Sequence, residues 1–138
     1  MDFSGKWHRI DRAGLNPMPV QQPIPIFMGG ASDAVLERAA RISDGWFPMV
    51  RERADIQALP ARIEALKRRV ESNGRDPEAF EIQVSTGIAN KAPEDWAKDV
   101  EMFEGMGADF LCFSTMGAGL AHPRDHIDAM RRFKEAID

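Results

Sequence analysis

Cysteine is nearly absent from this sequence, since Cys112 is the single one in 138 residues. One thiol excludes an internal disulfide and a metal cluster held by cysteines, and it favours a reducing cytoplasm. No apolar run approaches the ~20 residues that a membrane span needs, and the N-terminus lacks the apolar segment of a signal peptide. We therefore expect a cytoplasmic protein with no membrane partner.

An excess of positive charge is also missing. Lys and Arg number 18 against 22 Asp and Glu, which gives a net charge of −4, and no basic run contradicts this balance. These values argue against a nucleic-acid partner. The hydrophobic share of 43% and the charged share of 29% are ordinary for a soluble protein. A chain of this length fits one domain and can bury roughly two thirds of its unfolded surface.

Residues 23–46 carry the most informative pattern in the chain. The apolar run Pro23–Gly30 has its prolines near the start, where a strand tolerates them. Gly29-Gly30 ends this run where the backbone must turn. Ser32 is a typical helix cap, and helical spacing predicts a helix over Ser32–Ile42. Trp46 then opens a second strand, so the stretch predicts a strand–helix–strand unit with parallel strands.

The diglycine allows two interpretations. A glycine turn between a strand end and a capped helix start presents free backbone N–H groups and the positive end of a helix dipole, which suits a phosphate. The alternative is a tight strand–helix turn with no ligand, because a lone glycine pair is a weak signal. The local pattern leaves both open.

Further strand–helix alternation follows. Apolar spacing predicts a helix over 51–73, in which Pro60 either starts the main helix or kinks it. Phe80–Thr86 alternate, which predicts a strand with one less buried face or an edge position. The nearly continuous apolar run Ala108–Ser114 predicts a strand buried on both faces, which would make Cys112 a core thiol.

The last helix is predicted to begin at His122-Pro123, with Ile127, Met130 and Phe133 facing inward. His122 and His126 are one turn apart, a spacing that metal sites use. No matching carboxylate set accompanies them, so we predict no metal.

Taken together, residues 1–22 are expected to form an extended arm that packs on the outside of the domain or on a partner, and 23–138 to form a single α/β domain. Such alternation predicts a parallel sheet, in which ligands bind at the carboxyl ends of the strands. The loops expected to converge there are Gly29–Ser32, Pro48–Arg51, Thr86–Asn90 and Thr115–Leu120.

Several motifs match one known family. The segment FSGKWHRIDRAGLNPMPVQQPIPIFMGG, followed by DGWFP, resembles the luciferase-like monooxygenase family, and most of all the branch that uses a deazaflavin coenzyme in place of flavin. GRDP at Gly74–Pro77 and GADFLCFSTMGAGL at Gly107–Leu120 match as well. The resemblance runs from Phe3 to the end and implies a TIM (β/α)8 barrel. Because such a barrel has ~250 residues, the chain corresponds to the C-terminal half of one.

The resemblance also implies a coenzyme and its contacts. The coenzyme is FMN or a deazaflavin (F-420 type), which carries the hydride while the protein places it against the substrate. Gly29 and Gly30 match the family diglycine that lies against the coenzyme's phosphate or side chain, and Ala31 and Ser32 would add donors. The remaining implied site residues are Asp44 and Trp46 at the DGW turn, and Thr115 and Met116 after the last strand. No general base can be named.

Half of a barrel leaves two open sheet edges, and open edges invite pairing with another chain. The inner face, which we expect to carry Ile26, Phe47, Val84 and Leu111, would also be partly bare. We therefore expect either a homodimer or a separate N-terminal half-barrel chain as partner.

The expected function is a luciferase-like oxidoreductase, or a component of one. It would bind the phosphate of a flavin or deazaflavin coenzyme for hydride transfer or monooxygenation of a small organic substrate. The alternative is a non-catalytic half-barrel remnant that self-associates and at most binds a phosphorylated ligand. A flavodoxin-like phosphate-binding module fits the α/β pattern but not the family motifs.

Overall fold

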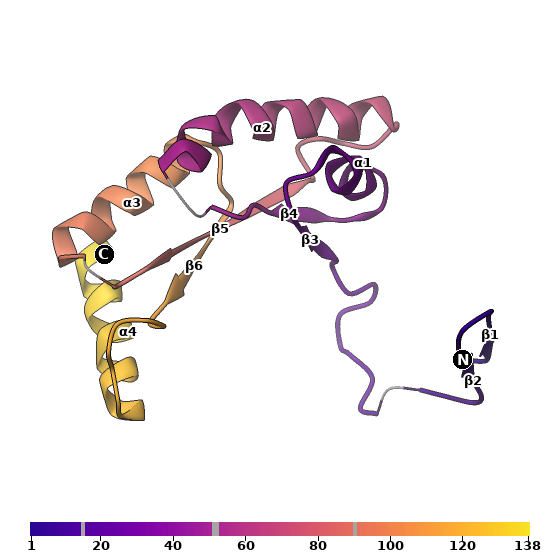
Figure 1. Cartoon of the computed structure of the whole chain (residues 1–138), viewed down its shortest axis with the longest axis horizontal. Helices are drawn as coiled ribbons and strands as arrows, with labels where there is room; N and C mark the ends of the chain where they lie inside the picture. The colour runs from indigo at the N-terminus through magenta and orange to yellow at the C-terminus, as the bar shows by residue number, and fades with distance from the viewer. Residues whose placement is uncertain (15, 51–52, 90) are drawn as a thin grey trace.

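Strands and helices alternate along most of the chain in a computed structural model, which describes residues 1–14, 16–50, 53–89 and 91–138 (Figure 1). Strands β1 (Phe3–Ser4) and β2 (Arg9–Ile10) form a small antiparallel hairpin. The body that follows consists of β3 (Phe27–Gly29), α1 (Asp33–Ile42), β4 (Gly45–Phe47), α2 (Arg53–Ser72), β5 (Glu81–Gly87), α3 (Pro93–Gly105), β6 (Phe110–Ser114) and α4 (Pro123–Ile137).

The body contains one parallel sheet, with its strands in chain order β3-β4-β5-β6. This arrangement confirms the predicted α/β class and the parallel βαβ unit. The predicted alternation in β5 is also confirmed, because Ile82, Val84 and Thr86 are buried while the residues between them are not. The alternative of an edge position for this strand is wrong, since β5 lies between β4 and β6.

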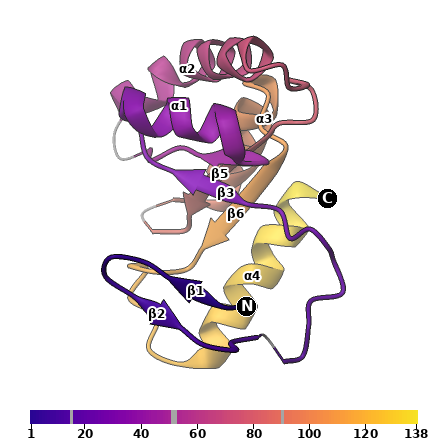
Figure 2. The ribbon, with the colours of Figure 1, turned by 90° about the vertical axis from the view of Figure 1, so that its right-hand side faces the viewer.

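The helices cover one face of this sheet, as the two perpendicular views show for α1 and α2 (Figures 1 and 2). The core lies between them and the sheet. Trp46, Ile82 and Val84 from the strands meet the predicted apolar stripe of α2, whose buried members are Leu59, Ile63, Leu66 and Val70. The helix α2 continues through Pro60, so this proline does not start it. None of the helices within the described ranges is long and apolar enough to cross a membrane.

The opposite face of the sheet is open. The predicted burial of β6 on both faces is wrong, because Phe110 and Cys112 are exposed there, and Cys112 is not a core thiol. The prediction for the inner face also needs correction. Val84 and Leu111 are paired neighbours that pack toward the helix layer, not toward the open face. Alternation defines two faces of a strand but not which of them the helices cover.

The first strand of the body is shorter than predicted. It begins at Phe27 rather than at Pro23, and Ile24 and Ile26 are exposed. Prolines at 23 and 25 lack the N–H group that strand pairing uses, so pairing starts only after them.

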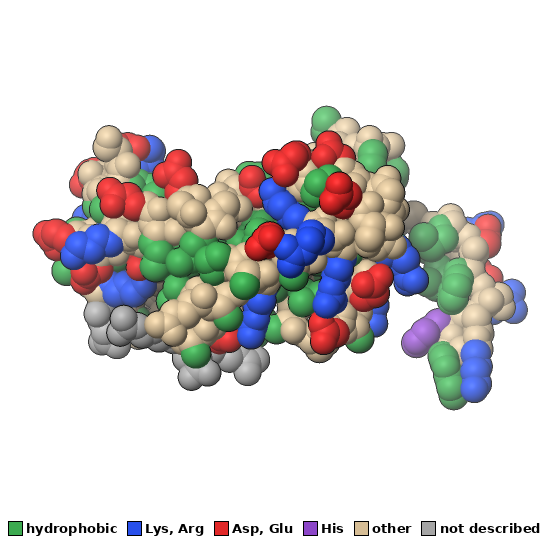
Figure 3. Space-filling view, turned by 90° about the horizontal axis from the view of Figure 1, so that it is seen from above, with side chains coloured by type: hydrophobic (Ala, Val, Ile, Leu, Met, Phe, Trp, Pro, Cys, Tyr) green, Lys and Arg blue, Asp and Glu red, His purple; other side chains and the backbone are tan. Residues whose placement is uncertain are grey.

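The N-terminal arm stands apart from the body, at the right of Figures 1 and 3. Its hydrogen bonds join its own residues, such as Met1 N to Ala13 O at 2.8 Å and Arg12 N to the Asp2 carboxylate at 2.8 Å. The apolar side chains of Trp7 and Val20 are exposed. In Figure 2 the hairpin overlaps α4, but Figure 1 shows the two at opposite ends of the molecule.

Candidate functional site

The diglycine turn after β3 requires glycine at its second position. Gly30 has a φ of +118°, which side chains rarely adopt, and a Cβ atom there would lie 3.1 Å from Val35 Cγ1. At Gly29 the nearest atom to such a Cβ is the Phe47 carbonyl oxygen at 3.6 Å, an ordinary contact. The turn therefore depends on Gly30 more than on Gly29.

The Trp46 side chain fixes the backbone of this turn. Its indole Nε1–H donates a hydrogen bond of 2.7 Å to the carbonyl oxygen of Gly30. The side chain of Trp46 is fully buried in the core. Trp46, which the family resemblance placed among the site residues, thus positions the diglycine rather than facing the solvent where a ligand would lie.

The start of α1 follows directly. Ser32 is its N-cap by position, with extended backbone, but the expected cap by its hydroxyl does not form. Its carbonyl oxygen accepts from Val35 N at 2.9 Å and from Leu36 N at 3.0 Å. The backbone N–H groups of Asp33 and Ala34, which precede these two, have no acceptor within the helix. Ala31 and Ser32 are exposed, so these N–H groups and the Ser32 hydroxyl are suited to donate to an anion.

A carboxylate stands close to these donors. Asp33, in the first turn of α1, pairs with Arg69 of α2 at 2.7 Å, and Arg69 also donates to the Asp33 carbonyl oxygen at 3.3 Å. The ion pair ties the start of α1 to the C-terminal half of α2. It also offsets the negative charge that Asp33 brings to the helix N-terminus.

Asp44 lies at the other end of the sheet. It precedes β4, whereas the diglycine follows β3, and these two strands are parallel. The Asp44 carboxylate accepts from Ile26 N at 2.8 Å. This contact joins residues that are 18 positions apart in the sequence, and it fixes the entry into β3. The structure does not bring Asp44 together with Gly29–Ser32.

Thr115 and Met116 follow β6, at the same end of the sheet as the diglycine but at its opposite edge. Three strand spacings separate these edges, which corresponds to about 14 Å. Thr115 Oγ1 lies 2.7 Å from His126 Nδ1 of α4, and the Met116 side chain is 82% exposed. Sequence reasoning considered His126 only as a metal ligand and missed this contact, which no local motif signals.

The loops after β5 and β6, two of the four that were expected to converge at the carboxyl ends of the strands, line a hollow of about 330 Å³. Among its lining residues are Lys91, Trp96, Gly117 and Arg132. Lys91 pairs with Asp99 of α3 and donates to Thr86 Oγ1 at 2.9 Å, so its charge is already balanced. The predicted convergence of these two loops is confirmed, whereas the contributions of Lys91 and Arg132 to the hollow gave no sequence signal.

Parallel strands in chain order, each followed by a helix on the same face, define part of a (β/α)8 barrel. The glycine turn at the carboxyl end of β3 lies where such barrels bind ligands. Residues 1–132 match the family described as luciferase-like monooxygenase, and the chain belongs to that family.

Similar proteins agree with this assignment. An uncharacterised protein of Mycobacterium tuberculosis (strain ATCC 25618 / H37Rv) is 40% identical over 83 residues, which cover 60% of this chain and 27% of that protein. An FMNH2-dependent dimethylsulfone monooxygenase of Pseudomonas putida is 29% identical over 99 residues, 71% of this chain and 26% of that enzyme.

Among solved structures, an F420-dependent secondary alcohol dehydrogenase in complex with an F420-acetone adduct has a TM-score of 0.50 at 17% identity. The match covers 99% of this chain and 47% of that one, and at this identity it shows the fold alone. The chain thus spans less than half the length of each of these three proteins.

Proposed function

We propose that this chain holds the phosphate of a flavin or deazaflavin coenzyme at Gly29–Ser32, as part of an oxidoreductase or monooxygenase site for a small organic substrate. The observation that carries the proposal is the turn itself. Gly30 adopts a positive φ, Trp46 fixes its carbonyl group, and the donors at the start of α1 follow at once. Family membership supports the coenzyme class, since one relative depends on FMNH2 and a structural neighbour on F420.

The residues of the turn fit a phosphate group. Backbone N–H groups at a helix N-terminus and the positive helix dipole favour an anion. The missing Cβ of Gly30 lets the backbone approach it closely, and the Ser32 hydroxyl adds a donor that the helix does not use. The bound coenzyme would supply the hydride chemistry. The role of the chain is to fix one end of that coenzyme while the other end meets the substrate.

A second candidate is a binding protein without turnover. The open sheet face favours it, because Phe110 and Cys112 are exposed where a complete barrel would be filled. Both candidates use the same phosphate site, and they differ only in whether a substrate is converted.

Comparison of FMN with riboflavin, which lacks the phosphate, tests the site. Flavin fluorescence should show that FMN binds about 10- to 100-fold more tightly, as expected for charge-assisted hydrogen bonds worth ~1.5–3 kcal/mol. Ser32→Asp places a negative charge at the turn and should abolish this preference, while the helix is preserved because Asp is a good N-cap. Ala61→Asp is the control, because Ala61 is exposed and lies about two helical turns along α2 from Arg69, which contacts Asp33. Equal binding of FMN and riboflavin by the original chain would contradict the phosphate site.

Turnover separates the two candidates. The deazaflavin coenzyme with a small secondary alcohol, and reduced FMN with dioxygen and a small sulfone, are the substrate pairs that the relatives' names suggest. Conversion of either pair supports an oxidoreductase. Tight FMN or deazaflavin binding with no conversion supports the binding protein.

A further inference from the structure

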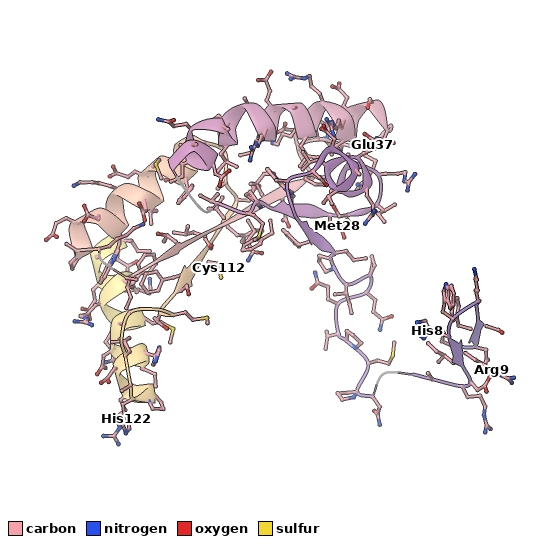
Figure 4. The ribbon with its side chains drawn as sticks, in the orientation of Figure 1. His8, Arg9, Met28, Glu37, Cys112 and His122 are labelled. Carbon is pink, nitrogen blue, oxygen red and sulfur yellow. The ribbon has the colours of Figure 1, made fainter. Side chains whose placement is uncertain are left out.

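The face of the sheet opposite the helices has no covering layer among the described residues. It carries apolar side chains on β3, β4 and β6, and the polar residues Glu81, Gln83 and Ser85 on β5. Phe27, Phe47, Phe110 and Cys112 all lie on this face, and Figure 4 shows Cys112 directed to the side away from α2. The rings of Phe27 and Phe110 meet edge to face at 6.3 Å, across the side-chain-free Gly45. Phe110 is nevertheless 49% exposed. We call this set the open face.

A hollow of about 270 Å³ lies at the edge of the sheet beside β6. Phe103, Phe110 and Leu111 line it, together with Glu104 and Asp109. On α4 only Phe133 of the three predicted inward residues is buried, because Ile127 and Met130 are exposed. Ile137 lies on the same flank at helical spacing and is exposed too. The apolar stripe of α4 is thus wider than the part of it that packs against the rest of the chain.

The exposed area of the chain is large for its mass. Its accessible surface is 9978 Å², whereas a folded monomer of 15.4 kDa exposes about 7,200 Å². The excess is roughly 2,800 Å², and the extended arm accounts for part of it. A standard interface takes about 800 Å² from each partner. The total excess therefore exceeds what one standard interface takes from a partner.

We infer that a second copy of this chain covers the open face, and that the two copies close into one eight-stranded parallel barrel. The sheet has two free edges, β3 and β6, and all its strands run in one direction. Rotation of a second copy by 180° about an axis parallel to the strands preserves their direction. It therefore places β6 of each copy beside β3 of the other, in parallel, at both seams. This two-fold arrangement removes both edges and buries both open faces.

Closure would also complete the candidate site. Within one chain the loop Thr115–Leu120 and the turn Gly29–Ser32 lie at opposite edges of the sheet, about 14 Å apart by strand spacing. Across a seam they would follow neighbouring strands, at about 5 Å spacing. Thr115 and Met116 of one copy would then face the phosphate turn of the other. This consequence rests on the proposed function, but the association of the two copies does not.

Mass in solution tests the association. Light scattering should give twice the chain mass at high concentration, with dissociation on dilution. Phe110→Lys puts a charge on the open face and should give the monomer mass at every concentration. Ala61→Lys adds the same charge on the exposed side of α2 and should leave the dimer intact. Far-UV circular dichroism checks that both variants fold. A monomer mass for the original chain at all concentrations overturns the inference.

Cross-linking tests the geometry without depending on Phe110. In a Cys112→Ser background, one chain carries Ser32→Cys and another Met116→Cys, both at exposed positions. A short bismaleimide should join the two chains when they are mixed, because these positions meet across a seam. Neither variant alone should cross-link, because identical strands lie on opposite sides of the barrel. Equal cross-linking of a single variant with itself overturns the two-fold barrel.

The cysteine of the original chain gives a third measurement. Cys112 should react with a thiol reagent more slowly as protein concentration rises, because closure places it inside the barrel. In Ala61→Cys/Cys112→Ser the rate should not change with concentration. None of these measurements uses a coenzyme, so a failed phosphate site would leave them unaffected.

Discussion

The indole Nε1–H of Trp46 donates to the carbonyl oxygen of Gly30 at 2.7 Å, which links the core under β4 to the turn after β3. The second buried tryptophan of the body, Trp96, behaves differently. Its Nε1 is buried and has no hydrogen-bond partner among the residues that the structure describes. Its ring packs edge to face on Phe113 at 5.9 Å and tilted on Phe133 at 6.1 Å. Trp46 therefore contributes a hydrogen bond as well as packing, whereas Trp96 contributes packing alone.

This contrast gives the first prediction. Trp46→Phe and Trp96→Phe remove similar apolar volume from buried sites, but only Trp46→Phe leaves a carbonyl group unpaired. We expect Trp46→Phe to lower the free energy of unfolding by about 1–2 kcal/mol more than Trp96→Phe does. Urea unfolding curves of the two variants measure this difference. An equal or larger loss for Trp96→Phe would show that the hydrogen bond contributes nothing to stability.

The second prediction concerns the diglycine. Gly30→Ala forces a side chain into a left-handed conformation and against Val35, so it should destabilise the protein by about 1–2 kcal/mol and weaken FMN binding. Gly29→Ala meets only an ordinary contact and should change stability by less than half of that. Thermal unfolding and flavin fluorescence of both variants provide the test. The prediction fails if the two substitutions have the same effect.

Local chemistry made part of this structure predictable. The turn at Gly30, with its positive φ, follows from the glycine pair itself. The parallel direction of the strands followed from the alternation of strands and helices. Their order did not, since a flavodoxin-like order fits the same alternation. Family motifs, rather than the periodicity, indicated the barrel.

Other features depend on contacts between separate elements. The pair Thr115–His126 and the cluster of Thr86, Lys91 and Asp99 join loops and strands to helices, at spacings that fit no motif. The alternation in β5 and β6 could not reveal that the helices lie over Val84 and Leu111 and leave Cys112 exposed. An apolar run that would be buried on both faces, as predicted for β6, implies a second covering layer. The described residues of one chain do not supply it.

A third prediction addresses the open face. A Cβ atom on Gly45 would lie 2.6 Å from the carbonyl oxygen of Glu81 and would overlap the Phe27 ring. Gly45→Ala should therefore destabilise the sheet by about 2–3 kcal/mol through overpacking. The double variant Phe27→Ala/Gly45→Ala should not recover this loss, because the backbone of β5 cannot move aside as a side chain can. Chemical unfolding of the single and double variants measures the loss in the free energy of unfolding. Full recovery in the double variant, relative to Phe27→Ala, would identify the ring as the sole obstacle.

The last prediction uses the charge of Asp33, which lies beside the proposed phosphate donors. Asp33→Asn removes a favourable helix-dipole contact and the ion pair with Arg69, so the free energy of unfolding should fall by about 0.5–1 kcal/mol. The same change removes a negative charge from the phosphate turn, so FMN should bind about 2- to 5-fold more tightly at low salt, an effect that added salt should reduce.

Glu37→Gln provides the matched control, because Glu37 is exposed on the same helix one turn further from its N-terminus. It removes the same charge at a greater distance from the turn, so its effect on FMN binding should be smaller. Stability and binding should thus change in opposite directions in Asp33→Asn and hardly at all in Glu37→Gln. Weaker FMN binding in Asp33→Asn would indicate that the phosphate does not lie at the start of α1, since loss of a nearby negative charge cannot repel an anion.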